Sequence, residues 1–121
     1  PYIEVTGSVE DVRPHVKKCA VNIAPLNIAR GTQNKILESL SMGVPVVTSE
    51  IAAGGVDAIP GEHFLTADGH EKFASAVISL LNNPEKRDHF SKSGRQRMMK
   101  NHNWEKSMMK LDEIIEKCLF Q

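Results

Sequence analysis

Short apolar runs alternate with helical patterns along the first part of the chain. Four of these runs predict strands, the last one short and at an edge of the sheet: 2–7, 20–26, 44–49 and 63–67. The run AVNIAPL at 20–26 is apolar enough to be buried on both faces, as strands of a parallel sheet are. Strands that alternate with helices predict a parallel sheet with right-handed crossovers.

Helix signals lie between the strands. Residues 8–18 predict a helix with Ser8 as its N-cap, acidic residues in its first turn and lysines near its end. A second helix follows Gly31 and stops at Gly43 and Pro45. The fold class is therefore α/β: a partial Rossmann-like domain of three or four mostly parallel strands with flanking helices and a helical C-terminus.

The later part of the chain is helical throughout. Asp68 and Glu71 form a capping-box pattern ahead of a helix that ends at Asn83-Pro84, where another helix begins. Asn103 is a predicted cap for a last helix over 104–120. This last helix has an apolar stripe in which we expect the cysteine to be buried: Trp104, Met108, Leu111, Ile115 and Cys118.

The composition limits the classes of function that we expect for this chain. The 121 residues fit a single domain, and 15 basic and 15 acidic residues give no net charge, so nucleic acid is not an expected partner. The two cysteines suggest no disulfide framework, so we expect a cytoplasmic protein. The five histidines show no ligand spacing, and no metal is expected. Because the chain starts at Pro1 in a strand-like run, we interpret 1–121 as a fragment of something longer.

In a parallel sheet of this kind, ligands bind beyond the carboxyl ends of the strands. Three loops lie there: 7–9, 25–34 and 49–55. In the helix after the middle loop, residues 100° apart place Ile36 and Leu40 on one side and Glu38 roughly opposite. Backbone N–H groups at the start of this helix could hold a phosphate, and Glu38 could accept hydrogen bonds from a vicinal diol such as a ribose. Phosphate and diol together describe a nucleotide.

A simpler interpretation stays open for Glu38. It lies three residues after Lys35, and an ion pair on a solvated helix face would have no function. The two glycines at 54–55 also have two interpretations, since they follow a strand and could approach a ligand, but glycine pairs are common in plain turns.

The chain also resembles a known family. The segments that carry the resemblance are VTGSVEDVRPHVKKCAVNIAPL, RGTQNKILESLSMGVPVVTS, GEHFLTAD and NHNWEK. In this order they are similar to the donor-binding half of GT-B glycosyltransferases, the large retaining family called family four. The R-G-x-Q-N-K variant resembles a bacterial branch of sugar transferases associated with exopolysaccharide systems.

The resemblance implies an enzyme that transfers a sugar from a nucleoside diphosphate sugar, without a metal or other cofactor. It implies an acceptor domain upstream on the same polypeptide, so the fragment alone should be inactive. It also implies a role for each matching position. Glu38 would bind the ribose hydroxyls, one loop would face the nucleobase, and the helix start would face the diphosphate: Gly7, Ser8 and Val9 for the base, and Gly31, Thr32, Gln33 and Asn34 for the diphosphate.

Arg30 departs from the family pattern. The family commonly has a glutamate eight positions before the one matched by Glu38, close to the sugar, and Arg30 stands there instead. Arg30 could clamp the diphosphate, accept an acidic sugar, or face solvent. With Glu38 it completes the residues we assign to catalysis.

Two alternatives to an enzyme concern the whole chain. One is a non-catalytic nucleotide-binding module, with Arg30 as a sign of decay. The other is a receiver-type signalling domain, which would need acidic residues at its strand ends.

The basic stretch between Lys86 and Lys100 has two interpretations. It is either a solvated helix that covers the sheet or a peripheral contact with the inner face of a membrane.

Overall fold

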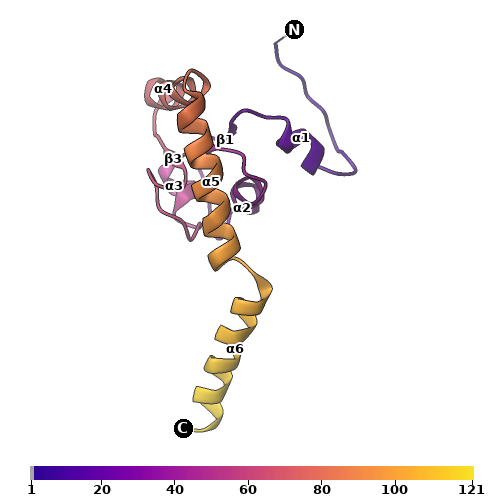
Figure 1. Ribbon diagram of the computed structural model, residues 1–121, viewed down its shortest axis with the longest axis vertical. Coiled ribbons are helices and arrows are strands. Elements are labelled where there is room, and N and C mark those ends of the chain that lie inside the picture. Colours follow the sequence, from indigo (N-terminus) through magenta and orange to yellow (C-terminus); the bar gives the residue numbers. More distant parts are fainter. Residues whose placement is uncertain (1) are drawn as a thin grey trace.

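The computed structural model describes residues 2–121 and contains a small parallel sheet (Figure 1). Its strands are β1 (Asn22–Ala24), β2 (Val46–Thr48) and β3 (Leu65–Thr66), in the order β1-β2-β3. Val47 of β2 lies opposite Ile23 on one side and Leu65 on the other. The predicted fold class is confirmed, and β3 is the short edge strand that was expected within 63–67.

Six helices accompany the sheet in the described residues, and their bounds are α1 (Arg13–Lys17), α2 (Asn34–Ser41), α3 (Glu50–Ala53), α4 (His70–Leu81), α5 (Pro84–Asn101) and α6 (Trp104–Leu119). Asn103 caps α6 as predicted, and Asn83 caps α5 at the helix start that was predicted there. Each side chain accepts a hydrogen bond from the backbone N–H three residues on. The long helix α5 contacts both α2 and α4, and Figure 1 shows it running beside the sheet.

The central strand β2 is completely buried and separates two hydrophobic clusters. Val46 belongs to the cluster that includes Ile36 and Phe64, whereas Val47 belongs to the cluster with Leu80. Successive side chains of a strand point to opposite faces, so each face of β2 carries one cluster. Helix α5 contributes to both clusters, through Phe90 to one and Met98 to the other.

The predicted strand at 2–7 is absent from the described residues. Tyr2, Ile3 and Val5 are 99%, 90% and 88% exposed, so this segment has no neighbour to pair with. A lone extended segment is not stable as a strand, because its backbone hydrogen bonds need a partner. The expectation that 20–26 is buried on both faces is also wrong, since Ile23 in β1 is half exposed.

The predicted helix at 8–18 is reduced to α1. Pro14 occupies the first turn, where its missing N–H does no harm, but a helix that began earlier would bring its ring against the carbonyl four residues before it. Ser8 is therefore not a cap. The carboxylate of Asp11 instead accepts a hydrogen bond from the Arg13 backbone at 2.9 Å.

The capping box at Asp68 and Glu71 does not form. Helix α4 starts after Gly69, whose φ is 83°, and no side chain caps it. Asp68 accepts a hydrogen bond from the backbone N–H of Glu50 at 3.2 Å, at the start of α3. Asp68 therefore connects the end of β3 to the loop after β2.

Helix α6 extends away from the rest of the fold (Figure 1). None of its residues is buried, and its first residue, Trp104, is 82% exposed. The expectation that Cys118 is buried is wrong, because the apolar stripe of α6, Cys118 included, is exposed. The helical periodicity was predicted correctly and the burial was not.

Candidate functional site

The loops after β1 and β2 are held together at the carboxyl ends of the strands. The Ser49 hydroxyl donates to the carbonyl of Leu26 at 2.7 Å, and the Ser49 backbone N–H donates to the carbonyl of Ala24 at 3.2 Å. The Thr48 hydroxyl also donates to the Ala24 carbonyl, at 3.1 Å. These bonds fix the start of the loop that leads to α2.

Helix α2 presents its two faces as predicted. Ile36 and Leu40 are fully buried, and Glu38 is exposed on the opposite side. Ser39 is buried and is satisfied locally, since its hydroxyl donates to the Lys35 carbonyl and accepts from the side chain of Asn22. This contact attaches the helix to β1.

The start of α2 differs from the prediction. Gly31, Thr32 and Gln33 precede the helix, which begins at Asn34. The first helical N–H groups without a partner in residues 2–121 are therefore those of Asn34 and Lys35. The Gln33 side chain donates to the Arg30 carbonyl at 3.3 Å, so the loop before the helix is a compact turn.

Glu38 lines an open cavity of about 720 Å³. Leu37 and Ser41 of the same helix line it as well, together with residues 10–13 and the start of α6. Within residues 2–121 no ion pair connects Glu38 to Lys35, so the simple surface pair does not account for this carboxylate. The Glu38 carboxylate is exposed and borders the open cavity.

The cavity is acidic on one side. Besides Glu38 it has Glu10 and Asp11 in its wall. Arg13 pairs with Asp11 at 2.9 Å, and its hydrogen bond holds the pKa of Asp11 below the ordinary range. Arg13 also lines the cavity and neutralises Asp11, which leaves Glu10 and Glu38 as the lining carboxylates without an ion-pair partner in residues 2–121. Such carboxylates accept hydrogen bonds from hydroxyl groups and repel phosphates. A diol is therefore a better match for this cavity than a diphosphate.

The other predicted site residues do not line this cavity. Gly7, Ser8 and Val9 are exposed and immediately precede the segment 10–13 that lines it. Arg30 is exposed, and its guanidinium makes no ion pair within residues 2–121. Neither this cavity nor a second one of about 790 Å³, between β1 and α4, is lined by residues 30–34. The structure thus brings Glu38 close to the first loop but not into one cavity with the helix start.

The two glycines after α3 differ in what surrounds them. A Cβ on Gly55 would lie 2.0 Å from the carbonyl oxygen of Gly31, whereas one on Gly54 would meet only the carbonyl oxygen of Ile51, at 3.6 Å. Both glycines lie in a turn, in agreement with the simpler interpretation, but the turn at Gly55 has a further contact. Gly55 is packed backbone to backbone against the loop before α2.

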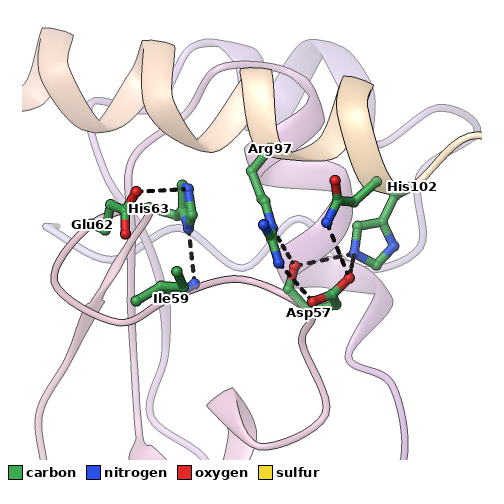
Figure 2. A network of polar contacts seen from close by, with 7 residues as sticks. Asp57, Ile59, Glu62, His63, Arg97 and His102 are labelled. Atoms are coloured by element: carbon green, nitrogen blue, oxygen red, sulfur yellow. Dashed lines mark hydrogen bonds and ion pairs between the residues drawn. The ribbon is translucent and has the colours of Figure 1, made fainter.

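A polar network beside this loop was missed by sequence reasoning (Figure 2). Arg97 of α5 donates to the Asp57 carbonyl at 3.0 Å and to its carboxylate at 2.8 Å. The hydrogen bond from Arg97 to the carboxylate, aided by Asn101, holds the pKa of Asp57 below its ordinary value. His102, after the end of α5, lies 3.9 Å from the same carboxylate. Nothing local in the sequence signals a contact between residues so far apart in the chain.

His63 is the buried titratable group of the same region (Figure 2). Its Nδ1 accepts a hydrogen bond from the Ile59 backbone at 2.8 Å, and its Nε2 lies 3.7 Å from the Glu62 carboxylate. Burial lowers the pKa of His63 below its ordinary value of 6.5, and nearby Arg97 acts in the same direction. Glu62 and Asp57 oppose that shift by favouring the charged ring.

We expect His63 to make the stability depend on pH. Because its pKa is lower in the folded state, the unfolded chain takes up the proton first as the pH falls below 6.5. The free energy of unfolding should therefore decrease with falling pH until the folded-state pKa is passed. Urea unfolding above and below pH 6.5 measures this, with His63→Asn as the control that keeps an acceptor but does not titrate. An equal pH dependence in both proteins would contradict the expectation.

The comparison with known families settles the class of the protein. Residues 1–83 match the model of the glycosyl transferases group 1. The chain belongs to this family. The match covers the strands, α2 and all the predicted site residues of this group 1 glycosyltransferase, whereas α5 and α6 lie outside it. No curated protein matches the chain.

Residues 2–121 contain no cluster of three or more His, Cys, Asp or Glu side chains able to hold a metal ion. Among the same residues, no helix combines the length and the apolar character that crossing a membrane would take.

Proposed function

We propose that this chain is the donor-binding part of a glycosyltransferase that transfers a sugar from a nucleoside diphosphate sugar to an acceptor in glycan or exopolysaccharide synthesis. Membership of the group 1 glycosyl transferases supports glycosyl transfer as the type of reaction. The observation that carries the donor assignment is the exposed Glu38 carboxylate, which faces a cavity next to residues 10–13 without an ion-pair partner in the described chain.

In this proposal the nucleoside lies in the cavity of Glu38. The carboxylate accepts hydrogen bonds from both ribose hydroxyls, and the loop of Gly7, Ser8 and Val9 lies against the base. Each charge-assisted hydrogen bond would contribute roughly 1.5–3 kcal/mol. The carboxylate of Glu10, which has no ion-pair partner in residues 2–121, favours a neutral, hydroxyl-bearing group at this place.

The diphosphate extends from the cavity toward residues 30–34. There the free N–H groups of Asn34 and Lys35 and the positive end of the helix dipole favour an anion. Arg30 begins this loop, and its guanidinium can bind two phosphate oxygens at once. When the sugar leaves, negative charge grows on the diphosphate, and donors fixed in advance stabilise that charge in the transition state.

The rest of the machinery is proposed to lie in an acceptor domain upstream on the same polypeptide. The reaction would then take place between the two domains, and residues 1–121 alone would bind a nucleotide without transferring a sugar. No metal or other cofactor takes part in this proposal. We place the protein in the cytoplasm, with a peripheral contact to the inner face of the membrane as an option for a lipid-linked acceptor.

A titration of the full-length protein tests the donor assignment. We expect affinity to increase from a nucleoside to its monophosphate and further to its diphosphate, because each phosphate adds contacts at the start of α2. Isothermal calorimetry with uridine, guanosine and adenosine series measures this order. If no nucleoside diphosphate binds, the assignment is refuted.

A second measurement, product analysis, separates the enzyme from a non-catalytic nucleotide-binding module. Arg30 in place of the family's glutamate is the observation that favours the module. A module would bind the diphosphate but would neither transfer the sugar nor hydrolyse a nucleotide sugar. Product analysis on the donor that binds most tightly decides between the two.

A further inference from the structure

Gly55 lies in backbone contact with the loop that leads to α2. A Cβ at this position would be 2.0 Å from the carbonyl oxygen of Gly31, 2.8 Å from its carbonyl carbon and 3.4 Å from the Cα of Thr32. All three atoms are backbone atoms, so no rotamer change could relieve the contact. Any side chain at Gly55 must displace one of the two backbone segments.

The segment around Gly55 is the more firmly held of the two. On one side Ala52 is fully buried in the core, and on the other side Val56 is buried in the same cluster. The next residue, Asp57, is bound through its carbonyl and its carboxylate by Arg97 of α5 (Figure 2). The Arg97 side chain is only 25% exposed.

The loop before α2 is held less firmly. Gly31 and Thr32 are exposed, and Gly31 has a φ of 67°. The hydrogen bond from the Gln33 side chain to the Arg30 carbonyl is local and exposed. A displacement would therefore move this loop rather than the segment of Gly55.

We propose that Gly55 is a positioning residue, whose backbone supports the loop of Arg30, Gly31 and Thr32 and so sets the place of the nucleotide's diphosphate. This role rests on the proposed function, which puts the diphosphate beside that loop. Arg97 contributes by holding Asp57, and with it Gly55, against α5. Neither Gly55 nor Arg97 needs to contact the nucleotide.

The chain offers a matched control in Gly54. A Cβ at Gly54 would be in ordinary contact with the Ile51 carbonyl oxygen at 3.6 Å, and its φ of −60° suits any residue. Gly54→Ala and Gly55→Ala thus add the same methyl group at neighbouring positions. Only Gly55→Ala places this methyl group against the backbone of the loop before α2.

The test compares the affinity of both variants for a nucleoside and for its diphosphate in the full-length protein. For Gly55→Ala we expect diphosphate affinity to fall about ten-fold or more, since small displacements of a binding group are costly, while nucleoside affinity stays within about two-fold. Gly54→Ala should change neither. Equal losses for nucleoside and diphosphate, or no loss at all, would overturn the positioning role.

A second pair of variants keeps the proposal testable if Gly55→Ala does not fold. Arg97→Met removes both hydrogen bonds to Asp57 but keeps an apolar side chain, and we expect the same selective loss for the diphosphate. Arg87→Met is the control, because Arg87 also donates to backbone carbonyls, those of Leu80 and Leu81 in α4. If the wild-type protein binds no diphosphate, the proposed function is refuted. If the wild-type protein binds the diphosphate but the variants show no selective loss of diphosphate affinity, only the positioning role is refuted.

Discussion

Replacing Glu38 by alanine is expected to lower the affinity of the full-length protein for its nucleoside diphosphate by about 100-fold. The estimate takes two charge-assisted hydrogen bonds to ribose at the lower end of their range, about 1.5 kcal/mol each, where about 1.4 kcal/mol corresponds to a factor of ten. The lower end applies because Glu38 is exposed and water competes for the carboxylate. Calorimetric titration of both proteins measures the difference.

The choice of ligand makes this prediction specific. The wild-type protein should prefer a ribonucleotide over its 2′-deoxy analogue, because only the ribonucleotide offers a vicinal diol. Glu38→Ala should lose that preference, and Glu38→Gln should keep part of it, since an amide retains one acceptor. Glu71→Ala, an exposed glutamate in the first turn of α4, serves as the control and should behave like wild type. A Glu38→Ala protein that still distinguishes the two sugars would refute the ribose contact.

Reversing the charge of Arg30 is the second change for which we expect a large effect. In Arg30→Glu the diphosphate loses a bidentate, charge-assisted contact and meets a like charge instead. We expect affinity for the diphosphate to fall about 100-fold, on the basis of roughly 1.5–3 kcal/mol for the lost contact and a smaller repulsion. The affinity for the nucleoside should stay within about two-fold, because Glu38 and the first loop are unchanged.

The result also discriminates between the roles open to Arg30. If this residue accepts an acidic sugar, Arg30→Glu weakens binding of nucleoside diphosphate uronic acids and leaves the plain diphosphate unaffected. If it faces solvent, every ligand binds as before, and Arg30 is removed from the site. Lys100→Glu makes the same charge change on an exposed residue of α5. It is the control for a general effect of the protein's net charge on ligand affinity.

Most of the fold could be predicted where the signal is local. The apolar spacing of Ile36 and Leu40 identified the buried face of α2, and Asn83 and Asn103 identified two helix starts. The failures have a common physical cause. The strand expected at 2–7 needs a partner strand, and burial of Cys118 needs an element that covers the apolar stripe of α6, neither of which is present in the described residues.

The candidate site likewise has some features that the local sequence predicts and others that depend on tertiary packing. The outward direction of Glu38 follows from helical periodicity alone, and the structure agrees with it. The close approach of Gly55 to Gly31 and the bond from Arg97 to Asp57 depend on how loops and helices pack in space. No pattern of neighbouring residues encodes such contacts, so sequence reasoning could offer a turn or a ligand for the glycine pair but not a backbone contact.

The position of α5 has a consequence for the boundaries of this glycosyltransferase domain. The family match ends at residue 83, just before this helix begins. Yet Phe90 closes the cluster on one face of β2, and Met98 closes the cluster on the other. A polypeptide trimmed to the matched residues would open both clusters to water, so the smallest autonomous folding unit must extend at least to the last turn of α5.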